Sequence, residues 1–80
     1  MFVFKIKINT IDHVKNLVHL LQPINADFDI SHNRYMVDAK SIMGIFSMDL
    51  SKPVDLVCHT DDKFLKDYIK EKLEFLGLLV

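Results

Sequence analysis

Apolar side chains alternate with other residues over the first eight positions of the chain. These apolar positions are Phe2, Phe4, Ile6 and Ile8. A period of two predicts a strand with one buried face. From residue 11 the spacing becomes helical, and the apolar positions are Ile11, Val14, Leu17, Val18 and Leu21. We expect this helix to take a capping oxygen from Asn9, Thr10 or Asp12 and to stop before Pro23.

Residues 26–39 contain two short alternating runs separated by the sequence SHNR. The apolar members of these runs are Phe28, Ile30, Tyr35 and Val37. Asn33 tolerates a positive φ angle, so the pattern predicts a hairpin with its turn at SHNR. The following sequence SIMGIFSM, residues 41–48, predicts a short helix with Ser41 as its N-cap.

A last strand and a last helix complete the pattern. Residues 51–59 predict a strand with Val54, Leu56 and Cys58 on one face. Residues 60–77 carry the strongest helical pattern of the chain, with an apolar face of Leu65, Tyr68, Ile69, Leu73 and Leu76. We expect Thr60 or Asp61 to cap this helix, two aspartates in its first turn to favour its dipole, and Gly77 to end it.

The order of elements predicts an α+β fold in a single domain spanning residues 1–80. We expect a four-stranded sheet with two long helices and one short helix on one face, an open-faced two-layer sandwich. The short helix has more apolar side chains than so few turns can bury: Ile42, Met43, Ile45, Phe46 and Met48. The excess predicts a partly exposed patch, for which methionine is well suited. The apolar tail, residues 78–80, is expected either to fold back on the last helix or to join a subunit contact.

Composition restricts the classes of function. Half of the 80 residues are apolar and the formal net charge is −1, which does not point to nucleic acid. Cys58 is the single cysteine, and we expect it to pack in the core rather than to react. No Cys/His cluster has the spacing of a metal site, so no metal and no cofactor are predicted. Lysines interrupt the apolar start, so we expect no membrane insertion and a cytoplasmic location.

The sequence YMVDAKSIMGIFSM, residues 35–48, resembles the serine-containing segment of HPr, the small phosphoryl carrier of the bacterial sugar phosphotransferase system. Its core, KSIMG, is characteristic of family members from Gram-positive bacteria. The length, the element order and the final amphipathic helix agree along nearly the whole chain. The resemblance implies an HPr-like fold and a carrier or regulatory protein rather than a turnover enzyme. It also implies three kinds of partner: enzyme I, the sugar-permease components, and the Ser kinase/phosphorylase of the family.

The first site implied by the resemblance is a histidine at the start of the first helix, within a pattern like G-L-H-A-R-P-A. Aligned without gaps around the helix, His13 takes the place of this histidine and Lys15 the place of the arginine. Asn16 then replaces the proline. A second alignment, counted back from Ser41 without a gap, puts Thr10 in the histidine's place. The sequence leaves both alignments open.

Phosphoryl transfer to a histidine needs a free ring nitrogen, the N–H donors of a helix N-terminus and a nearby cation. His13 lies in the first helical turn, and Lys15 is the candidate cation, although an ammonium lacks the bidentate fork of arginine. Asp12 adds a negative charge beside the incoming phosphate. The missing glycine, arginine and proline of the family pattern favour a weakened or absent carrier site.

The second implied site is the serine that an ATP-dependent kinase phosphorylates for carbon-source regulation, and Ser41 matches it. Capping and phosphorylation are compatible, because a phosphate at a helix N-terminus uses the same donors. The resemblance implies that the short helix, with the start of the first helix, forms the face on which partners dock. The docking residues predicted on the short helix are Ile42, Met43, Ile45, Phe46 and Met48.

Three functions remain open from the sequence. The first is an HPr-like phosphocarrier with His13 as nucleophile and Lys15 as phosphate partner. The second is a non-carrier regulatory module that docks partners on its short helix and signals through Ser41. The third is a small α+β interaction domain that keeps both matches as remnants. The chain has no Gly-rich phosphate loop that would indicate a nucleotide-binding enzyme.

Overall fold

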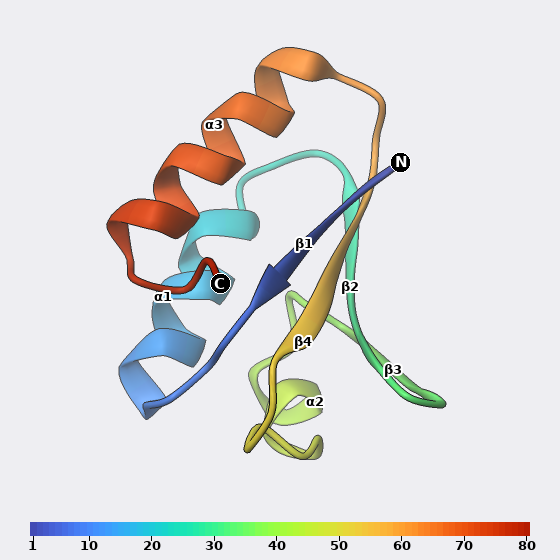
Figure 1. The fold of residues 1–80 in the computed structure, drawn as a ribbon. Coiled ribbons are helices and arrows are strands. Elements are labelled where there is room, and N and C mark those ends of the chain that lie inside the picture. The colour runs from blue at the N-terminus through green and yellow to red at the C-terminus, as the bar shows by residue number, and fades with distance from the viewer.

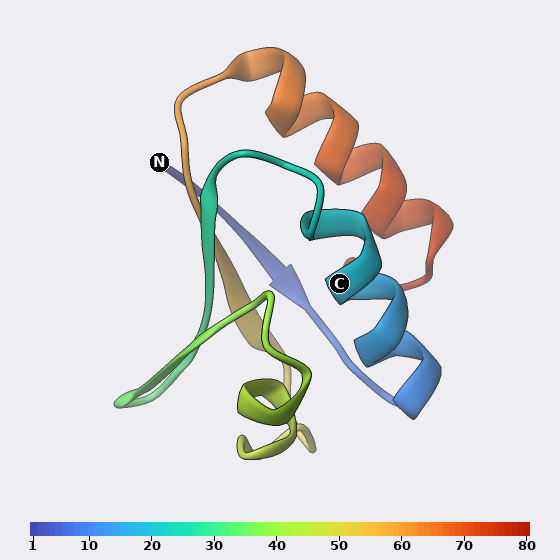
Figure 2. The ribbon, with the colours of Figure 1, turned by 180° about the vertical axis from the view of Figure 1, so that it is seen from behind.

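The four strands of the chain form one antiparallel sheet in the order β1-β4-β2-β3. The computed structural model describes all 80 residues. Its elements are β1 (Phe2–Ile6), α1 (Ile11–Leu21), β2 (Asp27–His32), β3 (Tyr35–Asp38), α2 (Ile42–Phe46), β4 (Val54–His59) and α3 (Lys63–Phe75). The two long helices lie on one side of the sheet, and α2 lies at the lower end of the molecule in both views (Figures 1 and 2). The predicted α+β fold and element order are confirmed.

Along the strands, the alternation of residues in the sequence corresponds to an alternation of buried and exposed side chains. In β1, Phe4 and Ile6 face the helices and are buried, whereas Val3 and Lys5 lie on the open side. Antiparallel pairing puts Lys5 opposite Asp55 of β4, and the lysine Nζ lies 2.8 Å from the carboxylate. Both side chains are partly exposed, so this ion pair adds little to stability. The fold therefore depends on the buried face.

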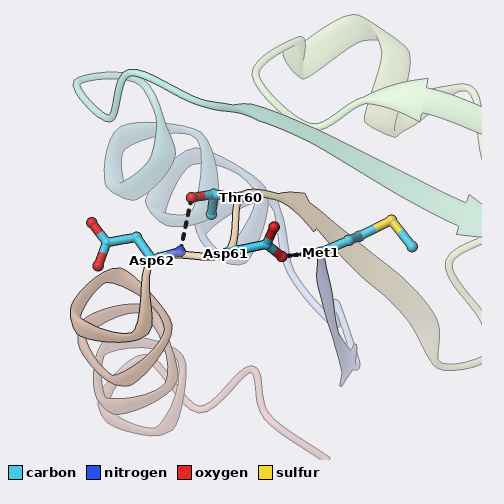
Figure 3. Close-up of polar contacts among 4 residues, drawn as sticks. All are labelled: Met1, Thr60, Asp61 and Asp62. Carbon is cyan, nitrogen blue, oxygen red and sulfur yellow. Dashed lines mark hydrogen bonds and ion pairs between the residues drawn. The ribbon is translucent and has the colours of Figure 1, made fainter.

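The start of α3 differs from the sequence prediction. Asp62 is the N-cap, not Thr60 or Asp61, and the first turn of the helix contains no acidic residue. The Asp62 carboxylate accepts hydrogen bonds from two backbone N–H groups, those of Phe64 and Leu65. Thr60 instead accepts a hydrogen bond from the Asp62 N–H at 3.2 Å, before the helix begins (Figure 3).

Asp61 has a different partner, the N-terminal amine of Met1 (Figure 3). The hydrogen bond from this ammonium, together with its charge, holds the pKa of the Asp61 carboxyl below its usual range. Both groups are well exposed, and the contact therefore links the start of β1 to the end of β4 only weakly.

The buried face of α3 is narrower than predicted. Ile69 and Leu73 are fully buried, and Leu65 and Leu76 are partly buried against the core. Tyr68, which the sequence placed on the same face, is 46% exposed. It lies at the margin of the buried face because it is one residue before Ile69 and one residue turns an α-helix by about 100°.

Two local predictions are confirmed. Asn33 has a φ of 54° in the turn between β2 and β3. Cys58 is fully buried in β4, and this burial raises the pKa of its thiol to about 12, so the group is an unreactive packing residue. No helix combines the length and the hydrophobicity needed to cross a bilayer.

The apolar tail returns to the sheet and pairs with the outer edge of β1. The Lys7 N–H donates to the Leu78 carbonyl oxygen at 2.9 Å, and the Val80 N–H donates to the Lys5 carbonyl oxygen at 3.0 Å. Gly77 turns the chain back after α3 with a φ of 73°, a value that suits glycine. The tail therefore does fold back, but it binds β1 as a short extra strand, and the Leu78 side chain is completely buried.

The two ends of this tail should differ in their effect on stability. We expect Leu78→Ala to lower the free energy of unfolding by about 2–4 kcal/mol, because it leaves a cavity in the core. Val80→Ala removes a side chain that is 70% exposed and should change that free energy by less than about 0.5 kcal/mol. Urea denaturation of both variants measures the difference. Equal values would show that the tail does not dock on β1 in solution.

Candidate functional site between the start of α1 and α2

His13 is the third residue of α1 and takes part in a reciprocal cap at the helix start. The Thr10 side-chain oxygen accepts a hydrogen bond from the His13 backbone N–H at 3.0 Å. In return, the Nδ1 of the His13 ring accepts a hydrogen bond from the Asn9 backbone N–H, also at 3.0 Å. The arrangement differs from a capping box, in which the third helical side chain accepts from the N-cap N–H, because the His13 ring accepts from Asn9, one residue before the N-cap Thr10. His13 therefore has a structural role that the sequence analysis did not anticipate.

The cap limits the nucleophilic chemistry of this ring. Because Nδ1 accepts the Asn9 hydrogen bond, the proton of the neutral ring belongs on Nε2. Neither nitrogen then offers a free lone pair to a phosphoryl donor while the cap is intact. Phosphorylation of His13 requires that the Asn9 hydrogen bond break, because either Nδ1 itself reacts or the ring proton moves to Nδ1 and frees Nε2.

Lys15 and His13, paired in the sequence prediction, do not lie on the same side of α1. Two residues along a helix correspond to a rotation of about 200°, so their side chains point to opposite sides. Lys15 is exposed and takes part in none of the ion pairs of the structure. The start of α1 still offers two N–H groups without a partner in the chain, those of Ile11 and Asp12.

The cation that the fold brings to the start of α1 is Lys7. Its Nζ donates hydrogen bonds to the Asn9 side-chain oxygen and to the Leu50 carbonyl oxygen, both at 2.9 Å. The sequence analysis missed it because Lys7 belongs to the alternating pattern of the first strand, and because Leu50 lies 43 residues away. No local spacing could have indicated this contact.

An open pocket of about 360 Å³ lies between the start of α1 and the chain around the end of α2. Lys7 and Thr10 contribute polar groups to its wall, and the side chains of Ile11, Phe46 and Leu50 contribute apolar surface. The pocket is thus mainly apolar with one cation at its edge. Its shape and lining suit a side chain of a partner protein better than they suit a polar metabolite.

The predicted docking residues of α2 divide into two groups. Met43 is 78% exposed, Phe46 is 43% exposed and Ile42 is 37% exposed. Ile45 and Met48 are buried in the core, so the prediction that they belong to the docking face was wrong. Ile45 is on the inner side of α2, and Met48 follows the C-cap Ser47 and packs in the core just beyond the helix. Ile11 of α1 is 61% exposed and completes an apolar surface, here called the α1–α2 surface: Ile11, Ile42, Met43 and Phe46.

Ser41 is the N-cap of α2, as predicted. Its Oγ accepts a hydrogen bond from the Gly44 N–H at 3.0 Å. A Cβ atom at position 44 would lie 3.2 Å from this oxygen, so glycine provides room for the cap. Lys40 is occupied elsewhere, since its Nζ donates to the Ile24 carbonyl oxygen at 2.7 Å and lies 5.7 Å from the centre of the Phe28 ring. The lysine of KSIMG therefore anchors the loop before α2.

Comparison with solved structures relates this fold to an HPr. The crystal structure of HPr-C-His from Thermoanaerobacter tengcongensis matches with a TM-score of 0.71 and 25% sequence identity, over 95% of this chain and 89% of that chain. No protein-family model and no curated protein sequence matches the chain. The fold is therefore HPr-like, and the evidence for this class lies in the three-dimensional structure.

We expect Ser41→Ala to lower the free energy of unfolding by about 1 kcal/mol, because the Gly44 N–H loses its acceptor. Ser41→Asp should retain most of that stability, since aspartate is an equally good N-cap. Thermal or urea denaturation of the two variants provides the measurement. A similar loss in both variants would show that the cap does not stabilise α2.

The structural role of His13 can be separated from any catalytic role. His13→Ala removes the acceptor of the Asn9 N–H and should cost about 1 kcal/mol of stability, whereas His13→Gln offers a capping-box acceptor to the N–H of the N-cap Thr10 and should cost less than half as much. Hydrogen exchange of the Asn9 amide should accelerate in the alanine variant, because this N–H then has no acceptor. An unprotected Asn9 amide in the unmodified protein would contradict the cap.

Proposed function

We propose that this chain is an HPr-like protein of the sugar phosphotransferase system that acts as a regulatory binding module rather than as a phosphoryl carrier. The observation that carries this proposal is the hydrogen bond from the Asn9 N–H to the Nδ1 of His13. A ring committed to a helix cap is a poor phosphoryl acceptor. Lys15 lies on the opposite side of α1 from His13, which further weakens the case for a carrier site.

The α1–α2 surface supports the binding role. It combines exposed apolar side chains, among them the flexible Met43, with an open pocket beside Phe46. Ser41 directly precedes Ile42, the first α2 residue of this surface. A phosphate there would add a charge of about −1.5 to −2 at neutral pH, which would repel an acidic partner and attract a basic one.

The partners on this proposal are the proteins implied by the HPr resemblance: enzyme I, the sugar-permease components, and the Ser kinase/phosphorylase. The proposal gives the chain a cytoplasmic place beside them. It needs no cofactor, because the kinase transfers the phosphoryl group from ATP to Ser41.

Phosphoryl carriage by His13 is the second candidate. It is favoured by the two N–H groups of Ile11 and Asp12 that have no partner in the chain, and by the ammonium of Lys7 near the same helix start. Such donors stabilise a phosphate once it has been transferred. On this alternative the Asn9 hydrogen bond breaks during each transfer.

Intact mass after two separate incubations tests both candidates. The first incubation uses phosphoenolpyruvate with enzyme I, and the second uses ATP with the family's serine kinase. We expect no added phosphate in the first, and one acid-stable phosphate in the second that is absent in Ser41→Ala. His13→Gln serves as the control for the first incubation because it removes the imidazole and still offers a capping acceptor at the helix start.

One acid-labile phosphate in the first incubation, lost in His13→Gln, would overturn the proposal and establish a carrier. No added phosphate in either incubation would contradict both candidates, provided that the enzymes are active on a standard HPr. A phosphate that persists in Ser41→Ala would place the modification at another residue and remove the support for signalling at α2.

A further inference from the structure

The sheet has two edges, and the chain covers only one of them. Along β1 the C-terminal tail pairs as a short extra strand, through the hydrogen bond from the Lys7 N–H to the Leu78 carbonyl oxygen. β3 is the opposite edge strand and pairs only with β2. In Figure 2 no element is drawn across β3. β3 also has no lysine, proline or bulge, the features that commonly block pairing at an exposed edge.

The hydrogen-bond pattern leaves the backbone of Met36 free at this edge. The Ala39 N–H donates to the Phe28 carbonyl oxygen at 2.9 Å, so these two residues form a hydrogen-bonded pair between β3 and β2. Such pairs alternate along an antiparallel ladder. The N–H and C=O groups of Met36 and the N–H of Asp38 therefore point away from β2. Backbone groups spaced in this way on one side of a strand match the backbone of another strand.

Two antiparallel copies of β3 match when Met36 lies opposite Met36 of the second copy. The two residues then exchange both backbone hydrogen bonds, because their N–H and C=O groups face each other. On the helix side of the sheet, Tyr35 of each copy lies opposite Val37 of the other, an aromatic and β-branched pair of the kind that stabilises sheets. Tyr35 is 65% exposed and Met36 is 59% exposed in the single chain, so the pairing covers apolar surface.

The charges of this edge are complementary in the same register. Arg34 lies opposite Asp38 of the second copy at a Cα separation of about 5.5 Å, and a two-fold axis repeats the contact. Like charges are far apart, since each Arg34 is about 14 Å from the other Arg34, and each Asp38 about 14 Å from the other Asp38. Arg34 takes part in none of the ion pairs within the chain. It is therefore available to a second copy.

The other charges near this edge do not oppose the pairing. α2 contains no charged residue, and the Lys40 ammonium is held at the Ile24 carbonyl oxygen. Asp29 of β2 lies opposite Asp38 within one chain, a like-charge pair that a nearby cation would stabilise. In the dimer, Asp29 is about 10 Å from Arg34 of the second copy and about 17 Å from its Asp38. The nearer charge is the attractive one.

We propose that the free edge of β3 is a self-association surface, at which a second copy of this chain adds its own β3 in an antiparallel arrangement with Met36 beside the two-fold axis. The two four-stranded sheets then form one continuous sheet. Because β3 has only four residues, the interface is smaller than that of a standard stable complex. We expect a dissociation constant on the order of 100 µM. The inference does not rest on the proposed function.

Sedimentation velocity of the full chain, from about 10 µM to about 1 mM, tests for a reversible monomer–dimer equilibrium. Met36→Pro should weaken the dimer at least about tenfold, because it removes a hydrogen bond on each side of the axis. The variant keeps its own sheet, since β2 does not accept the Met36 N–H. Met36→Thr is the matched control: it also removes the methionine side chain but keeps the N–H, so it should retain the dimer.

Charge reversal tests the register. Arg34→Glu and Asp38→Lys should each be monomeric alone, because each change puts like charges opposite each other twice. An equimolar mixture of the two variants should dimerise again, since the two substituted side chains attract each other and the two unchanged ones do too. Both positions are exposed, and circular dichroism checks that each variant is folded. Hydrogen exchange of the Met36 amide in the unmodified chain should slow as the protein concentration rises.

Three results would each overturn the inference: a monomer at every concentration, a dimer that persists in Met36→Pro, or a variant mixture that stays monomeric. A synthetic hexapeptide of alternating lysine and valine distinguishes the other occupant of this edge. A chain that is monomeric in solution, yet binds this peptide with shifts of its Met36 and Asp38 amide resonances, would assign the edge to a basic strand of another protein instead.

Discussion

The candidate site depends on the pairing of β4 with β1. β4 is the last strand in the sequence, yet it lies between β1 and β2 and has apolar residues buried along its length. The antiparallel register puts Ile6, at the end of β1, opposite Val54, at the start of β4. The chain that leads into α1 therefore lies beside the chain that leads out of α2. The Lys7–Leu50 hydrogen bond and the pocket next to it follow from this one register.

Two requirements conflict at His13. A helix start needs acceptors for its free N–H groups, and a phosphoryl carrier needs a ring nitrogen that accepts nothing else. In this chain the ring accepts from Asn9 N–H, and the helix start is stabilised accordingly.

The sequence was sufficient to predict the strands and helices, because buried side chains recur with a period of two in the strands and with the helical period in the helices. It was insufficient at the start of α3, where Thr60, Asp61 and Asp62 are all good caps. The choice among them depends on where β4 ends its pairing, at His59 opposite Asp27, which is a tertiary constraint. A local pattern carries no information about that register.

The site was predictable only in part, for a similar reason. The local motif was enough to identify Ser41 as a cap, because the cap and its donor lie three residues apart. It could not identify Lys7, whose partner Leu50 is distant in sequence. It could not sort the apolar residues of α2 either, because a five-residue helix has too little periodicity to separate the buried Ile45 from the exposed Met43.

The shortness of α2 also makes it responsive to a change at its start. A helix of five residues is not stable alone, so it depends on the Ser41 cap and on the burial of Ile45. The Ser41 oxygen that would carry a phosphate is the oxygen that now accepts the Gly44 N–H. On the proposed function, phosphorylation would replace this acceptor with a more highly charged one at the N-cap of the helix that carries Met43. A small chemical change at Ser41 can reach the apolar surface by this route without any movement of the sheet.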